Sequence, residues 1–138
     1  MEKIYREKEF SSFRELIDNC AEQYGANTAF KIKIAENNYE HISFSCFREQ
    51  YYNLCSNFLL HGFRSARIAV IGKNCYEWIL SYLAAATVGV AVPLDKELGE
   101  EDIENFLSAA ECSLICADKE SSRKIGTEHT LFFFSEIR

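Results

Sequence analysis

Two polar segments of the sequence contain residue types that could hold an anion. Gly72, Lys73 and Asn74 directly follow an apolar run, and backbone N–H groups at the start of a helix can bind phosphate there. The segment 121–130, SSRKIGTEHT, combines hydroxyl groups, cations and a glycine. Neither segment has the spacing of a P-loop or of a GxGxxG turn. We therefore interpret the first as an ordinary strand-to-helix turn and the second as a solvated loop.

The acidic residues offer no arrangement for acid–base catalysis. Glu100, Glu101 and Asp102 are consecutive, so on a helix they point in different directions and form neither a carboxylate dyad nor a two-metal site. The sequence also lacks the GxSxG turn of hydrolases. An α/β unit without GxGxxG could still bind flavin at its strand ends, and only the fold class would support that function.

The cysteines and histidines are not spaced as metal ligands. Cys112 and Cys116 lie in a strand-like run about 13 Å apart, which is too far to share one tetrahedral ion. Cys46 and Cys55 would lie on opposite faces of one helix. We expect no catalytic, cofactor-binding or metal-binding residue in this chain. The six cysteines are interpreted as small core residues, and the three histidines have no cysteine at ligand spacing: Cys20, Cys46, Cys55, Cys75, Cys112, Cys116, and His41, His61, His129.

The composition is that of a globular protein. Its 138 residues are 48% hydrophobic and 26% charged, which is enough apolar material for a core. The formal net charge of −6 disfavours binding to nucleic acid or to anionic lipid, because both require an excess of Lys and Arg. The start, MEKIYREKEF, has no apolar signal-peptide core, so we expect a cytoplasmic protein with reduced thiols.

The first half of the chain predicts a helix, a hairpin and a second helix. Ser12 and Glu15 have the spacing of a capping box, and Gly25 would end the helix. Residues 28–34 and 39–42 alternate as two strands, joined by a turn at 36–38. Ser43 would cap the second helix, which Gly62 closes. The apolar stripes are Phe13, Leu16, Ile17, Cys20, Ala21 and Tyr24 on the first helix, and Phe47, Tyr51, Leu54, Cys55 and Phe58 on the second.

The second half predicts a parallel sheet with flanking helices. Continuous apolar runs at 67–72, 91–94, 113–116 and 131–134 are typical of strands that are covered on both faces. A helix with Ile103, Phe106, Leu107 and Ala110 on one face would precede the third run, and its acidic first turn favours the helix dipole. We therefore predict one α/β unit over residues 1–138, with right-handed crossovers between its parallel strands.

The stretch from Asn74 to Asp95 is unusually apolar. Residues 78–92 carry no charge, yet about 15 residues are fewer than the roughly 20 that a membrane-spanning helix needs. Asn74 and Glu77 have capping-box spacing, so we predict a helix over 75–88, ended by Gly89, and then a strand. Because this helix is apolar nearly all round, a second layer must cover it, and the chain offers little obvious material for that. The sequence is therefore expected to be part of a thicker structure.

Residues 67–98, RIAVIGKNCYEWILSYLAAATVGVAVPLDKEL, resemble the N-terminal region of adenylate-forming acyl-CoA synthetases. The likeness is greatest to AMP-forming long-chain fatty acid–CoA ligases and extends over about residues 10–118. It rests on a combination of pieces rather than on one diagnostic motif. These pieces are Asn74, Tyr76-Glu77-Trp78, the small-residue helix 82–89, Val92 to Asp95, and upstream Glu22 to Gly25 and Thr28 to Phe30.

The resemblance implies an enzyme that uses ATP and Mg²⁺ to convert a carboxylic acid to an acyl-adenylate and then transfers it to coenzyme A. The family binds these groups with a Ser/Thr/Gly-rich loop ending in Pro-Lys, a Thr-Glu motif, a ribose-binding Asp and a late Lys, and none of these occurs here. We therefore expect an inactive structural fragment whose partner is the remainder of the synthetase domain, with self-association through exposed apolar surface. The alternatives are a free-standing binding module, a fragment of an amino-acid-adenylating domain, and an unrelated flavodoxin-like domain.

Overall fold

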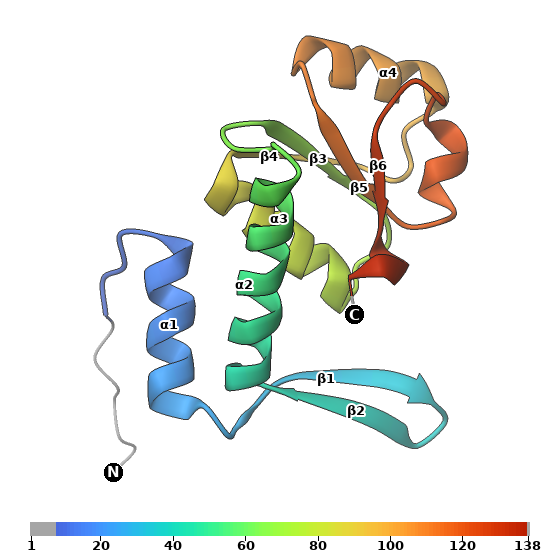
Figure 1. Cartoon of the computed structure of the whole chain (residues 1–138). Coiled ribbons are helices and arrows are strands. Elements are labelled where there is room, and N and C mark those ends of the chain that lie inside the picture. Colours follow the sequence, from blue (N-terminus) through green and yellow to red (C-terminus); the bar gives the residue numbers. More distant parts are fainter. Residues whose placement is uncertain (1–7, 138) are drawn as a thin grey trace.

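The computed structural model of the chain describes residues 8–137 (Figure 1). The predicted α/β class is confirmed: an N-terminal helix and a hairpin precede a parallel sheet with helices on both faces. The elements are α1 (Phe13–Tyr24), β1 (Thr28–Ala35), β2 (Asn38–Ser43), α2 (Phe44–Leu60), β3 (Arg67–Ile71), α3 (Tyr76–Val88), β4 (Val90–Leu94), α4 (Glu100–Ala109), β5 (Leu114–Ala117), η1 (Ser121–Lys124), β6 (Leu131–Phe133) and η2 (Phe134–Glu136).

The parallel sheet has the strand order β4-β3-β5-β6. Successive residues of the central strand β3 point to opposite faces, so Ile68 and Val70 pack towards α2 and α3 while Ala69 and Ile71 pack towards α4. All four side chains are fully buried. The predicted double covering of the sheet is therefore present, with α2 and α3 on one face and α4 on the other (Figure 1).

The first helix begins as the sequence predicts, with one difference in its cap. The Ser12 hydroxyl accepts a hydrogen bond from the Glu15 N–H at 3.1 Å. The Glu15 carboxylate, however, binds the N–H and the hydroxyl of Ser11 rather than the Ser12 backbone. The helix packs against α2, where the Tyr52 hydroxyl donates to Asp18 at 2.8–2.9 Å.

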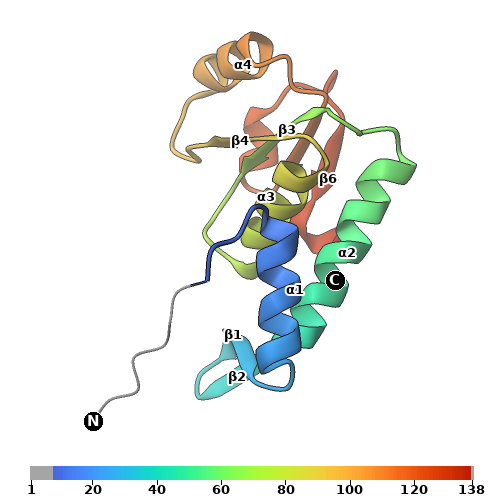
Figure 2. The same cartoon turned by 90° about the vertical axis from the view of Figure 1, so that its left-hand side faces the viewer.

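The hairpin β1–β2 extends from the foot of the α1–α2 pair, away from the sheet (Figure 2). Asn37 occupies the left-handed region at φ 56°, which is the conformation that the predicted turn requires. Phe30 anchors the hairpin, because its ring makes edge contacts with Phe47 and Tyr76 at centroid distances of 5.0 and 4.9 Å.

Helix α3 starts one residue later than predicted. Its N-cap is Cys75 rather than Asn74, so the expected capping box of Asn74 and Glu77 is wrong. The local motif fails because Cys75 is itself extended, at φ −150° and ψ 174°. The predicted end at Gly89 is confirmed.

The chain supplies its own cover for most of α3. One side of the helix packs on the sheet, and α2 packs against another, where the buried Tyr51 hydroxyl bonds to Thr87 at 2.5 Å. The expectation that little in the chain could cover this helix is therefore wrong for most of its surface, although Ile79 stays 37% exposed. Among residues 8–137, no helix combines the length and the apolar character needed to cross a membrane.

The strands near the C-terminus differ slightly from the apolar runs that predicted them. The third strand is shifted by one residue, to Leu114–Ala117. The last strand ends at Phe133, because Phe134 enters the turn η2 and its buried ring fills space beside the central strand. The polar segment 121–130 begins with the turn η1, which the sequence did not predict.

Candidate functional site

The parallel sheet has a topological switch point at the carboxyl end of β3. The chain leaves β3 for β4 on one side, whereas β5 adds to the other side of β3. In open α/β sheets, ligands bind in the crevice at such a point. The residues that follow β3 and β5 meet at this edge, which makes it a candidate ligand site.

Asp118 occupies the centre of this edge. Its two carboxylate oxygens accept the Lys73 N–H at 2.8 Å and the Ser121 N–H at 2.7 Å. Gly72, at φ +156°, leaves room for this contact, since a Cβ there would lie 2.9 Å from the Asp118 Oδ2 and 2.7 Å from the Phe134 ring. Partial burial raises the pKa of Asp118, but the hydrogen bonds from Ser121 and Lys73 outweigh it and hold that pKa below its ordinary value.

The cations at this edge are engaged with groups of the chain itself. The Lys73 Nζ lies 2.8 Å from a Glu120 oxygen, and Lys96 pairs with Glu97. The Lys124 Nζ donates to the carbonyls of Lys96 and Leu98 at 2.7 and 3.0 Å. The pocket between these groups measures about 70 Å³, and three lysines face three carboxylates around it: Lys73, Lys96, Lys124, Glu97, Asp118 and Glu120.

This edge does not fit a nucleotide. The N–H groups that would hold a phosphate are directed at Asp118, the formal charges of the lining cancel, and the pocket has room for only a few water molecules. In the sequence, Gly72–Asn74 and 121–130 are two separate candidate segments. The structure brings Lys73 from the first and Ser121 and Lys124 from the second around one pocket. The sequence motifs do not include Asp118, although an Asp directly after a buried strand is a recognisable signal.

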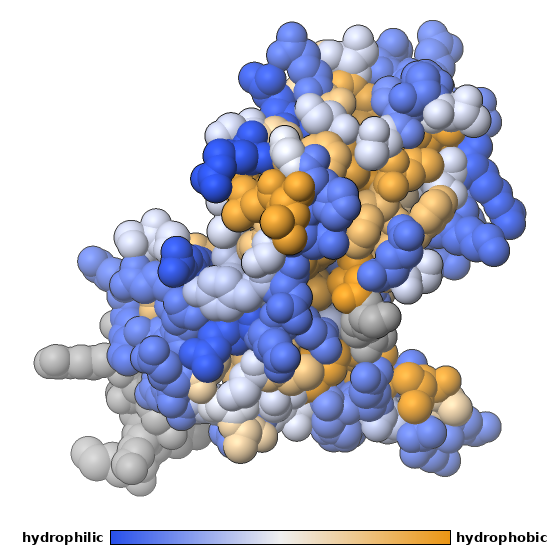
Figure 3. Space-filling model, in the orientation of Figure 1, coloured by the Kyte–Doolittle hydropathy of each residue, from blue (hydrophilic) through white to orange (hydrophobic). Residues whose placement is uncertain are grey.

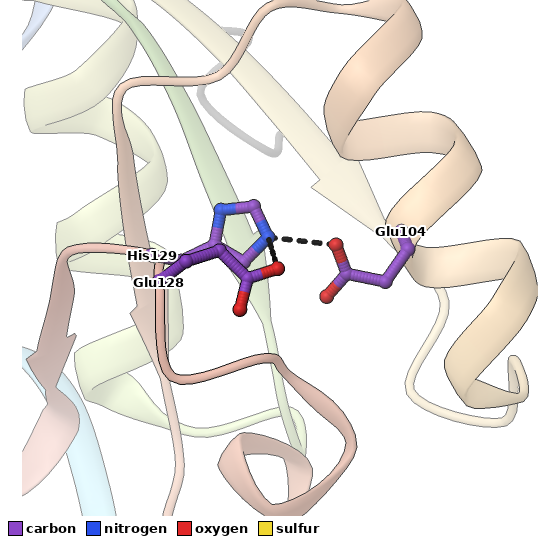
Figure 4. A group of neighbouring side chains, drawn as sticks. All are labelled: Glu104, Glu128 and His129. Atoms are coloured by element: carbon purple, nitrogen blue, oxygen red, sulfur yellow. Dashed lines mark hydrogen bonds and ion pairs between the residues drawn. The ribbon is translucent and has the colours of Figure 1, made fainter.

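A second polar cluster lies between α4 and the loop before β6. The Nε2 atom of His129 is 2.7 Å from the Glu104 Oε2 and 3.6 Å from the Glu128 Oε1 (Figure 4). The Gly126 N–H binds the other Glu104 oxygen at 3.0 Å. This backbone hydrogen bond, together with that from His129, holds the pKa of Glu104 below its ordinary value.

The sequence did not predict this cluster. From the sequence, His129 has no cysteine at ligand spacing, and the segment around it is interpreted as a solvated loop. The consecutive acids Glu100, Glu101 and Asp102 remain exposed at the start of α4, whereas Glu104 lies further along the helix and is half-buried. Because Glu104 and His129 are 25 residues apart, only the packing of the loop against α4 reveals that they meet.

The cysteines pack as expected at two positions. Cys55 and Cys116 are buried in the core, and burial raises the pKa of their thiols to about 11 and about 12 respectively. All six cysteines are free, and four of them are half-buried: Cys20, Cys46, Cys75 and Cys112.

An apolar groove of about 570 Å³ runs between β4 and α4. Val92, Leu94 and Leu98 line it, together with Phe106, which is 50% exposed. Apolar side chains also gather over strands β5 and β6 and at the end of α2, where Leu60 is 85% exposed (Figure 3). These surfaces are suited to contact with protein rather than with a polar cofactor.

A comparison with protein families identifies the family of the chain. The model of the AMP-binding enzyme family matches residues 17–131. The chain belongs to the AMP-binding enzyme family. This match covers every element from within α1 to the first residue of β6. No curated protein matches the chain.

Solved structures share the fold of this family member. The N-terminal subdomain of Klebsiella oxytoca NpsA is 16% identical with a TM-score of 0.75, over 91% of this chain and 32% of that one. The luciferase-like enzyme of the nonluminescent Zophobas morio mealworm is 20% identical with a TM-score of 0.70. The match covers 99% of this chain and 37% of that enzyme's chain. NpsA from Klebsiella oxytoca in complex with 3-hydroxyanthranilyl-AMSN is 16% identical with a TM-score of 0.76. The match covers 94% of this chain and 26% of that chain. The chain thus spans roughly a quarter to a third of these chains.

Members of this family generally use ATP and Mg²⁺. The phosphate-binding loop that the sequence resemblance implies, rich in Ser, Thr and Gly and ending in Pro-Lys, is absent from the 138 residues. The segment 121–130 has a single glycine, and its first residues bind Asp118 and neighbouring carbonyls.

Proposed function

We propose that the chain is the N-terminal structural part of an ATP-dependent, AMP-forming acyl-CoA synthetase of the fatty acid–CoA ligase type. The observation that carries this proposal is the closed carboxyl edge of the sheet, where Asp118 takes the N–H groups of Lys73 and Ser121. A family member whose switch point is closed in this way contributes rigidity rather than phosphate contacts. Residues 76–78 and 92–95, which carry the likeness to the ligases, lie at the start of α3 and the end of β4.

In this proposal the chain provides one sheet of a larger acid-activating domain. Its catalytic groups would come from sequence that the 138 residues do not contain, because the chemistry needs donors for a triphosphate and an environment that excludes water from the acyl-adenylate. The partner of the chain is then the remainder of the synthetase.

The first prediction is that the 138-residue chain alone does not activate acids. Pyrophosphate release is measured with ATP, Mg²⁺ and a panel of fatty, aromatic and amino acids, and we expect no release above that of a heat-denatured sample. Turnover by the pure chain that follows acid concentration would overturn the proposal.

The coding DNA after the codon for Arg138 gives an independent check, since it is expected to encode a Ser/Thr/Gly-rich loop ending in Pro-Lys. An in-frame stop codon with no such motif nearby would instead support a free-standing binding module.

A second candidate is part of a domain that adenylates aromatic or amino acids for transfer to a carrier protein. It is favoured by the solved neighbours, which include NpsA bound to 3-hydroxyanthranilyl-AMSN and an artificially fused adenylation–PCP di-domain, NpsA-ThdA. The two candidates differ in the acid used, so ATP–pyrophosphate exchange by the continuous protein with dodecanoate and with 3-hydroxyanthranilate separates them.

A further inference from the structure

The cluster of Glu104, Glu128 and His129 has the composition of a metal site. Glu104 projects from α4, whereas Glu128 and His129 come from the loop that precedes β6, and the three side chains converge (Figure 4). One ligand atom from each lies within 4.8 Å of the others. An imidazole nitrogen with two carboxylate oxygens is a donor set that binds zinc and similar transition ions rather than Mg²⁺ or Ca²⁺.

The distances in the cluster are close to those around a tetrahedral ion. Zinc binds imidazole nitrogen and carboxylate oxygen at about 2.0–2.2 Å, which places neighbouring ligand atoms roughly 3.3 Å apart. The Nε2 atom of His129 lies 2.7 Å from the Glu104 Oε2 and 3.6 Å from the Glu128 Oε1. Shifts of well under 1 Å bring these two pairs to the required separation. The Glu128 side chain is 69% exposed and has the freedom to make such a shift.

The site is partly organised before an ion enters. The Gly126 N–H holds one oxygen of Glu104 at 3.0 Å, so the other oxygen faces the imidazole. Support of a ligating carboxylate by such an outer hydrogen bond is common in metal sites. The Glu128 carboxylate lies over the same glycine, where a Cβ would be 2.3 Å from its Oε2.

We propose that Glu104, Glu128 and His129 bind one Zn²⁺ ion, with water at the fourth position. The Nε2 atom must offer a lone pair to the ion, so the proton that it now shares with Glu104 moves to Nδ1 or to solvent. The bound ion links α4 to the loop before β6 and thereby fastens the last strand of the sheet. This inference does not depend on the proposed function.

The site is tested by metal binding to the chelator-treated 138-residue chain. Zn²⁺ is titrated by calorimetry, and Co²⁺ is used as a coloured probe for the ligands. We expect one ion per chain, a rise of several degrees in the thermal midpoint with Zn²⁺, and the visible Co²⁺ bands of a four-coordinate site without the near-ultraviolet band of a cobalt–thiolate bond. The thiolate band matters because the chain has six free cysteines.

Matched variants assign the ligands. Glu128→Gln and His129→Gln are each expected to lower zinc affinity at least tenfold, in line with the loss of one ligand. Glu101→Gln, an exposed position on the same helix, and Cys112→Ser are expected to keep it. Since the Glu128 side chain is largely exposed, its variant is expected to fold even if His129→Gln does not. Absence of binding, full binding by Glu128→Gln, or a thiolate band that Cys112→Ser removes would each overturn the proposal.

Discussion

At the residue scale, one carboxylate joins the two segments that end the central strands. Asp118 follows β5, and one of its carboxylate oxygens accepts the Lys73 N–H after β3. Its second oxygen accepts the N–H of Ser121, the first residue of the turn η1. The neighbouring ion pair of Lys73 and Glu120 is about two-thirds exposed on both sides, so its contribution to stability is small. We therefore attribute the geometry of this edge to Asp118.

The second prediction concerns Asp118 and pH. Asp118→Ala is expected to lower the free energy of unfolding by about 1–3 kcal/mol at neutral pH, because two backbone N–H groups lose a charged acceptor. The folded pKa of Asp118 lies below its ordinary value of 3.8, so this stabilisation is full above that value and is lost as the pH falls through the folded pKa. Urea unfolding of the wild type and variant over a pH series from about 7 down to about 2 is the measurement.

Two further variants complete this test. Asp118→Asn keeps one acceptor oxygen and is expected to lose less stability than Asp118→Ala. Glu49→Gln, at an exposed position within α2, serves as the control and should change neither the stability nor its pH dependence. An effect of Asp118→Ala that is equally large at the two ends of this pH series would contradict this account.

At the element scale, the helices and strands were largely predictable and their contacts were not. The apolar runs and stripes placed the four α-helices and six strands of residues 8–137 to within a few residues, because burial repeats along the sequence with the period of the element. The start of α3 was misplaced, since Asn74 and Glu77 have capping spacing by chance while Cys75 takes the cap. The cluster of Glu104 and His129 was missed because spacing along the chain does not tell which loop packs on which helix.

The third prediction concerns the junction of α3 and β4. Gly89 lies against the backbone of Ala66, where a Cβ would be 2.1 Å from the Ala66 oxygen that accepts the Val90 N–H. Gly89→Ala is therefore expected to push β4 away from β3 and to cost about 2–4 kcal/mol of unfolding free energy. Gly99→Ser is the matched control, because the space beside Gly99 is open and a Ser there can cap α4. Denaturant midpoints that are lowered equally in the two variants would disprove the steric explanation.

At the scale of the whole molecule, the chain has more apolar surface than its own elements cover. Within residues 8–137, β4 and β6 are the edge strands of the sheet, and Val90 at one of these edges is 53% exposed. Phe106 and Leu60 are also exposed, on α4 and at the end of α2. A chain that spans roughly a third of its solved neighbours is expected to present such surface to a larger structure.

The fourth prediction is that the isolated chain associates with itself through this surface. Analytical ultracentrifugation is expected to show a weight-average mass that rises with protein concentration, because contact between two chains buries their exposed apolar patches. Phe106→Lys, beside the groove between β4 and α4, should shift the distribution towards the monomer. Ile34→Lys, at a similarly exposed position on the hairpin, should leave it unchanged. A strict monomer at high concentration, or equal effects of both variants, would contradict the prediction.

The strand order also has a consequence during synthesis of the chain. β3 lies inside the sheet, yet both of its neighbours come later in the sequence, and Leu114, the partner of Ile68 in β5, is 46 positions further along the chain. At about 5–20 residues per second, a ribosome takes roughly 2–9 s to add those residues. During that interval the central strand has at least one open hydrogen-bonding edge. Chaperones that bind extended apolar segments are therefore expected to meet residues 67–71 before any other part of the sheet.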